Sequence, residues 1–448
     1  MNKFLLFLTI AIVTSVIVTM QGYSTAGSVW DTHAIDGVSL LNFHTPEIPA
    51  FPMWGYSVLA ALGGKSIPIF EGIFLFCILA IWNSMITKSN NEIGLNISGT
   101  LWPLSFVIIL IPYIFVSVSY YSNSFFGMLI LLGAVFLQKA NKINSHLHWT
   151  ILSSLAFGTA YNIRNEAILF CLAFIFALFL HRLIQKKKLF SISRITVFVL
   201  LTLVSIGPWY WYTGHVLAAP RLGTTNSGGV MYLSLGIRPD NPWNIEFSDE
   251  FVGNIALQKN FGSPWSETAD KYFTMKTVDA VKAHPDAFAK KILTNLKLQI
   301  LQGTYVPNMR SIFGSELDKQ RLDYVNELFK GKIGLTVNES ELQTYLNNPD
   351  IFDEVTPAHF AIVLTEYAFR AGYALLFLML IALSLALTVL SRFRYLESWL
   401  FLAATGSTVL ISSLFLTLPR MSTIILPFAL WCSVTIYTDI RRSTRRIK

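Results

Sequence analysis

Long apolar runs recur along the chain and are separated by short polar segments. A helix needs about 20 apolar residues to cross the hydrocarbon core of a bilayer. Because lipid offers no hydrogen-bond partner to an open backbone, each run predicts a membrane-spanning helix. After a first run at residues 4–20, the runs lie at 68–86, 101–119, 148–162, 166–182, 195–212, 368–390, 397–416 and 421–438, and a further run follows YYSNS at 120–124 and ends at Lys139 and Lys142. We therefore predict an all-α integral membrane protein with about ten transmembrane helices.

The first apolar run has two interpretations. It follows Lys3 and precedes the small residues STAGS at 24–28, as in a secretory signal peptide with its cleavage region. The run is longer than the apolar core of ~7–15 residues that is usual in signal peptides, which favours an uncleaved anchor helix. Under either interpretation, residue 28 is expected on the far side of the membrane from the N-terminus.

A long polar stretch at residues 213–358 interrupts the series of spans and carries most of the acidic residues. We predict an N-terminal transmembrane module at 1–212, an extracytoplasmic insertion at 213–358 and a C-terminal transmembrane module at 359–448. The first module includes an outer loop at 21–67. The insertion is expected to be mixed but mainly helical. Its segment 286–302 alternates lysines with apolar side chains, which indicates either a helix on the membrane surface or a core helix of a small soluble domain.

Composition and charge support a membrane protein. Of the 448 residues, 53% are hydrophobic and 13% are charged, whereas soluble domains are about a quarter charged. The net charge of +8 does not indicate nucleic acid, because the basic residues cluster in short connections and at the C-terminus, as in cytoplasmic segments of membrane proteins. This distribution predicts that both termini are cytoplasmic. The three cysteines lie inside apolar runs and form no metal or disulfide motif.

Several charged residues collect at the predicted outer ends of the spans, where a charge is costly unless it is paired or hydrated. The candidates are Asp31 and Asp36 in the first outer loop, Arg164 and Glu166 in NIRNE, His215 and Arg221 after GPWYWY, and Arg420 in LPRM. Each also has a simpler interpretation: a structural Arg164–Glu166 pair, an Arg420 that reaches the lipid headgroups, or a solvated loop aspartate. His33 and His44 lack a metal-ligand spacing, so we expect neither a metal nor another cofactor.

One outer carboxylate together with outer arginines suits sugar transfer from a lipid phosphate. Glycoside hydrolysis normally needs two carboxylates, one of which protonates a poor leaving group. A phosphate leaving group is already a stable anion and needs cationic donors instead, and arginine binds phosphate through a bidentate fork. The acceptor hydroxyl needs a general base, which a nearby carboxylate can provide.

Short motifs along most of the chain resemble, in order, those of the GT-C superfamily of membrane glycosyltransferases. The resemblance is to the branch with the dolichyl-phosphate-mannose protein mannosyltransferases and the lipid A aminoarabinose transferase. The motifs are WDTHAID, FPMWGY, IRNEA, PWYWYTGHVLAAPRLGTTNSGGVMYLSLG, VKAHPDAFAKKI and LPRMSTIILP. In the long fourth motif, the resemblance implies a Gly-rich turn followed by an aliphatic strand.

The resemblance implies transfer of a sugar, with inversion, from a polyprenyl-phosphate donor to a glycan, lipid or protein acceptor on the extracytoplasmic face. The place of Asp31 in its motif favours it as the general base over Asp36. Arg164 and Arg420 are implied to bind the phosphate, with Glu166 orienting one of them. His215 and Arg221 are expected near the substrate, and the insertion is expected to select the acceptor. A bacterial inner membrane is the expected location.

Two alternatives remain open. An O-antigen polymerase or ligase also uses a polyprenyl-linked donor, and it would require Arg221 or Arg310 of the insertion rather than Asp31. A transporter or flippase would show internal repeats and helices broken near the membrane midplane. The two halves of the chain show no such repeat, which makes the transporter the weaker alternative.

Overall fold

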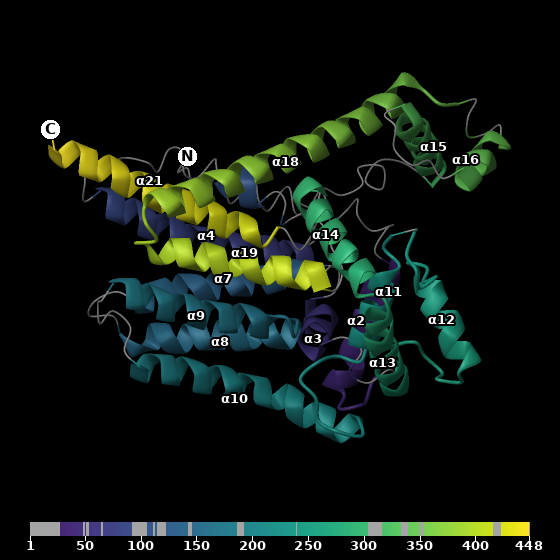
Figure 1. Ribbon diagram of the computed structural model, residues 1–448, viewed down its shortest axis with the longest axis horizontal. Coiled ribbons are helices and arrows are strands. Elements are labelled where there is room, and N and C mark those ends of the chain that lie inside the picture. Colours follow the sequence, from purple (N-terminus) through teal and green to yellow (C-terminus); the bar gives the residue numbers. More distant parts are fainter. Residues whose placement is uncertain are drawn as a thin grey trace.

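The computed structural model is helical, and no β-strand occurs among the residues that it describes. Long helices lie side by side in a bundle, and a group of shorter helices lies beyond one end of it (Figure 1). We call this the insertion end. The described residues are 27–47, 50, 53–63, 66–91, 105–110, 113, 122–141, 146–185, 192–238, 240–302, 316–332, 339–348, 351, 354–414 and 423–447.

The bundle contains eight helices of the described part of the chain. They are α4 (Ile67–Asn91), α7 (Asn123–Ala140), α8 (Leu147–Ile163), α9 (Ala167–Gln185), α10 (Ile192–Val216), α18 (Pro357–Leu390), α19 (Leu396–Leu414) and α21 (Ile425–Ile447). Four of them, α7, α9, α10 and α18, are long and apolar enough to cross a membrane. The prediction of an all-α protein with membrane-spanning helices is confirmed at this level.

The ends of several helices lie close to the predicted ends of the apolar runs, but α18 begins earlier than expected. Its first residue is Pro357, whereas the apolar run begins at 368. Thr356 caps the helix, the backbone N–H of Thr356 donates to Nδ1 of His359 at 3.0 Å, and Pro357 occupies the first turn. A capping residue followed by proline is a strong helix start, and it outweighs the polarity of the first turns. The run at 4–20 lies outside the described residues.

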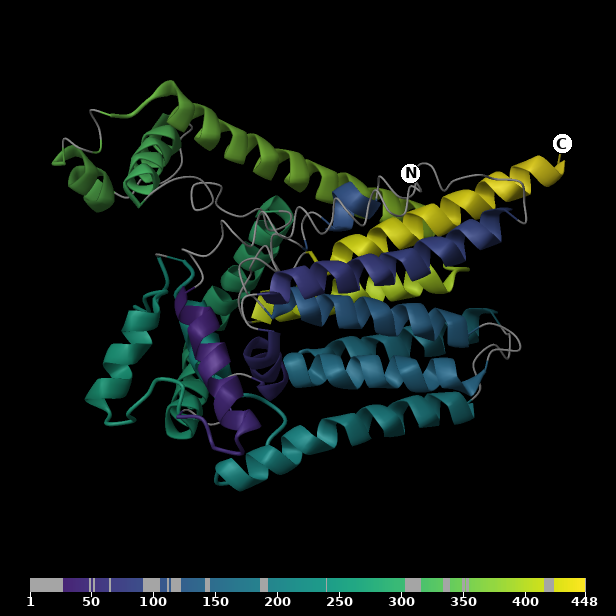
Figure 2. The same cartoon turned by 180° about the vertical axis from the view of Figure 1, so that it is seen from behind.

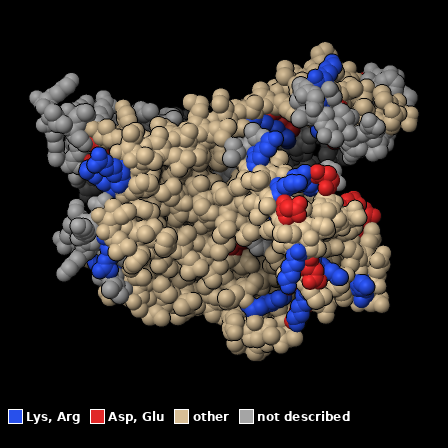
Figure 3. Space-filling model, viewed as in Figure 1, with Lys and Arg blue, Asp and Glu red and all other residues tan. Residues whose placement is uncertain are grey.

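The surface of the bundle separates into charged ends and an uncharged middle. Figure 3 shows Lys and Arg side chains gathered at both ends, with a broad zone between them that is almost free of charge. The bundle interior is apolar and rich in aromatic side chains, including Trp82, Trp209 and Trp431. A chain whose uncharged zone faces outward suits a lipid environment.

The predicted first outer loop is wrong in its local structure, because its described part contains two helices. These are α2 (Gly27–Leu41) and α3 (Trp54–Gly63), and α2 runs across the direction of the bundle helices at the insertion end (Figure 2). The two helices approach closely at Gly37, where a Cβ atom would lie 1.9 Å from the carbonyl oxygen of Ser57. Only glycine permits this contact, and the mutual packing explains why polar residues here form helices.

The insertion folds into helices α11 (Ser227–Leu235), α12 (Asp249–Gln258), α13 (Glu267–Ala283), α14 (Pro285–Gln302), α15 (Glu316–Lys332) and α16 (Glu339–Leu346). The strand expected after the Gly-rich turn is therefore wrong, since that segment forms α11. Leu233 of α11 packs with Val252, Ala269 and Phe273 in a small core of its own. Gly228 brings α11 against α13, because a Cβ atom there would lie 2.2 Å from the carbonyl oxygen of Asp270.

Helix α14 corresponds to the predicted amphipathic segment 286–302, but its faces differ from the prediction. Lys291 is fully buried, whereas Leu293 is 65% exposed. The helix packs against α19 and α18 of the bundle. The lysine is buried because it binds the end of α19, a partner more than a hundred residues away in sequence.

Candidate functional site

Arg164 lies in the turn between α8 and α9 and is held by three groups. Its Nη2 donates to Oε1 of Glu166 at 2.5 Å. Its Nη1 donates to Oδ1 of Asn123 at 3.1 Å and to Oγ of Ser122 at 3.3 Å, both at the start of α7. The predicted Arg164–Glu166 pair is therefore present, and it fixes the guanidinium between two helix ends.

A narrow crevice, closed too tightly in this structure to admit a water molecule, lies beside this pair. We call it the Arg164 cleft, and it is lined by Phe126, Arg164, Glu166, Phe170, Thr408, Ile411 and Ile424. The charged pair forms one part of the wall, and aromatic and aliphatic side chains from α7, α9, α19 and the turn before α21 form most of the rest. Such a lining suits an amphipathic ligand whose head is anionic and whose tail is apolar.

A second cavity, of about 90 Å³, lies between α8, α9 and α10. Its wall is mainly aliphatic, and no charged side chain occurs among the described residues that line it. Tyr161 closes one side of it, and its hydroxyl donates to the carbonyl oxygen of Leu222 at 2.5 Å. This cavity offers nothing to hold an anion, so the Arg164 cleft is the better candidate site.

Glu71 of α4 adds a buried carboxylate at the start of α7, the helix end that also holds Arg164, and the sequence-based candidates did not include it. Its side chain is 1% exposed, and it accepts a 2.5 Å hydrogen bond from Oγ of Ser124. Ser124 follows Asn123, which binds Arg164, so a polar chain runs from α4 to the α8–α9 turn. The sequence signal was a single carboxylate inside the apolar run IPIFEGIFLF, which marks a functional position in many membrane proteins.

Helix α3 is docked onto the end of α8, two residues before Arg164. Nε1 of Trp54 donates to Oδ1 of Asn162 at 2.7 Å. A Cβ atom at Gly55 would lie 2.5 Å from the carbonyl oxygen of Asn162, so the two backbones touch. Ser57, which contacts α2, is within the same turn of α3. One turn of α3 thus connects α2 with the Arg164 region.

Asp36 precedes Gly37, the point at which α2 meets α3, and is 9% exposed. Within the described residues, no hydrogen bond or ion pair to this carboxylate is present. Burial raises the pKa of Asp36 to about 6, and the nearby charge of Glu47 adds to the effect. Tyr212 of α10 lies close enough to feel the charge of the Asp36 carboxylate. A carboxylate with this pKa is ionised at neutral pH and is a competent proton acceptor.

Asp31 also lies in α2, but its side chain is outside the described part of the structure. Positions five residues apart in an α-helix are about 140° apart around the axis. The positions of Asp31 and Asp36 therefore do not share one face of α2.

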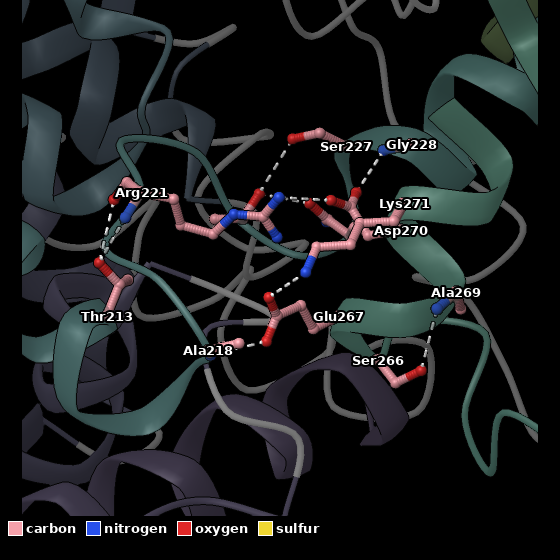
Figure 4. A network of polar contacts seen from close by, with 12 residues as sticks. Thr213, Ala218, Arg221, Ser227, Gly228, Ser266, Glu267, Ala269, Asp270 and Lys271 are labelled. Atoms are coloured by element: carbon pink, nitrogen blue, oxygen red, sulfur yellow. Dashed lines mark hydrogen bonds and ion pairs between the residues drawn. The ribbon is translucent and has the colours of Figure 1, made fainter. Parts of the chain in front are cut away.

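Arg221 belongs to a separate network within the insertion (Figure 4). Its Nη2 lies 2.9 Å from Oδ2 of Asp270, whose Oδ1 accepts a 2.6 Å hydrogen bond from the backbone N–H of Gly228. Burial raises the pKa of Asp270, while Gly228 and Arg221 oppose that rise. The backbone of Arg221 is also fixed, because its N–H donates to Oγ1 of Thr213 at 3.0 Å.

Glu267 extends this network toward the end of α10. It accepts a 3.0 Å hydrogen bond from the backbone N–H of Ala218 and pairs with Lys271 at 2.8 Å. The Ala218 amide, with help from Lys271, lowers the pKa of Glu267. The segment after α10 is therefore fastened to α13. It also contacts the first outer segment, since the N–H of Thr225 donates to the carbonyl oxygen of Ala50 at 2.9 Å.

The structure thus unites only part of the predicted site. Arg164 and Glu166 lie together, and α3 connects them to the helix that carries Asp36. Arg221 is engaged in the insertion network instead. His215 is exposed in the last turn of α10, with its ring centroid 4.4 Å from that of Trp211, and no described contact joins it to the Arg164 cleft. Arg420 lies outside the described residues.

Comparisons with protein-family models, with curated proteins and with solved structures return no match for this chain. Among the described residues, no group of three or more His, Cys, Asp and Glu side chains is placed to hold a metal ion. The function must therefore be inferred from the Arg164 cleft and from the helices around it.

Proposed function

We propose that this protein is a membrane glycosyltransferase of the GT-C type. It takes a sugar from a polyprenyl-phosphate donor and passes it, with inversion, to an acceptor on the extracytoplasmic face. The observation that carries the proposal is the Arg164 cleft, which combines a fixed guanidinium with apolar walls at the insertion end of a membrane bundle. A polyprenyl phosphate has the same two parts, an anionic head and a long apolar tail.

The chemistry of the cleft fits the departure of a phosphate. Arg164 is already aimed by Asn123 and Glu166, so little reorganisation is needed when charge develops on the leaving phosphate. No proton donor is required for that leaving group. Arg420 is the second proposed phosphate ligand, from the sequence motif LPRM. Four residues further along the chain, Ile424 lines the cleft.

A carboxylate of α2 is the proposed general base that removes the proton from the acceptor hydroxyl. The sequence resemblance favours Asp31, and the described geometry supports Asp36 through its burial and its pKa of about 6. Since the two positions lie on different sides of α2, separate variants distinguish them.

The proposal includes the complete topology. It has ten spans, both termini in the cytoplasm, and the insertion at 213–358 on the outer side of a bacterial inner membrane. In this arrangement the donor's tail stays in the bilayer while its head enters the Arg164 cleft, whose walls move apart to admit it. The acceptor, a glycan, a lipid or a protein, approaches from the side of the insertion.

The first test is sugar transfer in membranes that contain equal amounts of wild type, Asp31→Asn or Asp36→Asn. Label is followed from total polyprenyl-phosphate sugars into glycan or water-insoluble product. We expect one of the two variants to lose activity by at least 100-fold, in the range typical of a missing general base. Asp240→Asn is the matched control, because Asp240 is an exposed aspartate of the insertion that pairs with Arg238. Full activity of both α2 variants rejects the base assignment.

The same assay separates the O-antigen polymerase or ligase alternative. That alternative needs Arg221 or Arg310 and no aspartate of α2. The ion pair with Asp270 gives Arg221 a structural role, which weakens its case as a donor ligand. Arg310 lies outside the described residues. Loss of transfer in Arg310→Met, with full activity in both aspartate variants, would favour the polymerase or ligase.

A further inference from the structure

Helix α14 carries a line of three buried polar side chains. Lys291, Asn295 and Gln299 are four residues apart, so they follow one another along one face of the helix. Their exposed fractions are 0%, 0% and 3%. We call them the α14 polar line. A line of buried polar groups is costly unless each group has a partner.

The first two members of the line hold the C-terminus of α19. Nζ of Lys291 donates to the carbonyl oxygens of Leu414 at 2.6 Å and Ser413 at 3.2 Å. Nδ2 of Asn295 donates to those of Ser412 at 2.9 Å and Ser413 at 3.2 Å. The last carbonyls of a helix lack partners within the helix and carry negative partial charge, so these donors stabilise the end of α19.

The contact fixes α14 against α19, one of the helices that line the Arg164 cleft. Two residues of α19 line that cleft, Thr408 and Ile411. They lie within the last two turns of the helix, which ends at Leu414. Lys291 binds the carbonyl oxygen of Leu414 whereas Asn295 binds that of Ser412, so α14 runs back along the last turn of α19, and its next turn follows in the same direction. Gln299 occupies that turn.

Gln299 differs from the other two members of the line. Both its Nε2 and its Oε1 are buried, and neither forms a hydrogen bond with the described residues. A buried amide without partners destabilises a protein, and a leucine of similar size would be tolerated better at this position. A group that is unfavourable in the free protein is expected where a ligand uses it.

We propose that the side-chain amide of Gln299 binds hydroxyl groups of the sugar carried by the lipid-phosphate donor. This inference rests on the proposed glycosyltransferase function. An amide offers donors and an acceptor together, which matches adjacent hydroxyl groups on a sugar ring. Arg164 is the proposed ligand of the phosphate, and the polyprenyl tail has no polar group for an amide to bind. The sugar is the part of the donor that remains for Gln299.

Gln299→Leu separates a binding role from a structural one. If the amide has no partner in the free protein, the variant unfolds at the same temperature as wild type or at a higher one. The same change should weaken the donor by about 5- to 10-fold, as expected for one or two lost neutral hydrogen bonds. An amide that served only the fold would show the opposite: a lower unfolding temperature with unchanged donor affinity.

The decisive experiment measures affinity of the full-length protein in lipid nanodiscs. The probes are a short-chain polyprenyl phosphate without sugar and the same carrier bearing mannose, glucose or galactose. Wild type is expected to bind at least one sugar-bearing carrier more tightly than the bare carrier. Gln299→Leu should keep the affinity for the bare carrier and lose this preference. Gln258→Leu, at an exposed glutamine of α12, is the control and should keep it.

The outcomes distinguish the inference from the proposed function. If wild type binds no carrier at all, the proposed function fails and the inference fails with it. If wild type binds the bare carrier and Gln299→Leu retains the sugar preference, or wild type has none, only the inference is overturned. If Gln299→Leu retains the donor preference but raises KM for the acceptor in the transfer assay, the amide binds the acceptor and the donor assignment is wrong.

Discussion

Asp36 and Asp270 are both buried aspartates at the insertion end, and burial raises the pKa of each, but their surroundings differ. Asp270 receives the guanidinium of Arg221 and the amide of Gly228. Asp36 has no such partner among the described residues, and the charge of Glu47 raises its pKa further. Among the described residues, neighbouring donors compensate the charge of Asp270, whereas the charge of Asp36 has no such donor.

The difference separates charges that hold the fold from charges that suit chemistry. A compensated buried pair joins distant segments, as Arg221 and Asp270 do across 49 positions of the chain. An uncompensated buried carboxylate lowers stability, and such groups concentrate at functional sites. Arg164 and Arg221 differ in the same way, one suited to chemistry and the other to holding the fold. Arg164 pairs with a residue only two positions away and faces a cleft, whereas Arg221 fastens a linker to α13.

The largest expected effect is on transfer activity when Arg164 is replaced. We expect Arg164→Met to lower transfer by about 100-fold or more, because a fixed donor to a developing anion typically contributes this much. Arg164→Lys keeps the charge but loses the bidentate fork, and it should retain part of the activity. The measurement is the initial rate in nanodiscs at equal protein amounts. Arg238→Met, which removes an exposed pair, is the control.

Near-normal activity of Arg164→Met would remove the basis for the proposed function. A fall in the amount of folded protein without a fall in the rate per folded molecule would make Arg164 a structural residue like Arg221, and the comparison would no longer hold.

The next effect is on stability when Arg221 is replaced. Arg221→Met leaves Asp270 buried without its cation, and we expect the free energy of unfolding to fall by about 3 kcal/mol. The double variant Arg221→Met/Asp270→Asn should recover much of this loss, because no uncompensated charge remains. Denaturant unfolding followed by the fluorescence of Trp265, near α11 and α13, reports on this part of the insertion. A double variant as unstable as the single one would show that the pair is not what holds the linker.

Several apolar helices of the bundle are predicted from sequence, since an apolar run records its own length and polarity. The apolar runs at 166–182 and 397–416 correspond closely to α9 (Ala167–Gln185) and α19 (Leu396–Leu414). The carboxylate of Glu71 also had a visible signal, as a single acid within such a run. These features depend on local composition, and a sequence records local composition directly.

Features that depend on distant contacts were not predictable. The segment with Asp36 is helical because Gly37 packs against Ser57, and the sequence alone gives no sign of that contact. The strand implied after the Gly-rich turn is instead helix α11, which Gly228 allows to pack closely on α13. The sequence alone predicts an exposed position for Lys291, whereas in the structure its ammonium group is buried against the last carbonyl oxygens of α19. In each case a contact between distant parts of the chain outweighed the local pattern.

A smaller effect is expected on stability when Asp36 is replaced. The pKa of Asp36 is about 6 in the folded protein and near 3.8 in the unfolded chain. The folded state therefore binds more protons between pH 4 and 6, and wild type loses stability as pH rises through that range. Above pH 6 the loss is complete, and we expect Asp36→Asn to be more stable than wild type by about 2 kcal/mol at pH 7.5. Below pH 4 the two proteins should be equally stable.

The measurement is the free energy of unfolding of both proteins in detergent at several pH values. Asp270→Asn sharpens the comparison, because it removes a carboxylate that Arg221 compensates. It should not show the same gain at pH 7.5, since it leaves Arg221 without its partner. Equal gains in both variants would contradict the distinction between the two aspartates.

The smallest effect concerns Glu47, whose charge contributes to the raised pKa of Asp36. Glu47→Gln removes that repulsion and should lower the pKa of Asp36 slightly, since Glu47 is exposed and screened by water. The midpoint of the pH-dependent loss of stability should move down by the same amount, and 0.5 M salt should reduce the difference between the proteins. If Asp36 is the base, the acid side of the pH–rate profile moves with it. If the stability midpoint moves while the pH–rate profile stays fixed, Asp36 is a buried acid of the fold, and Asp31 becomes the stronger candidate for the base.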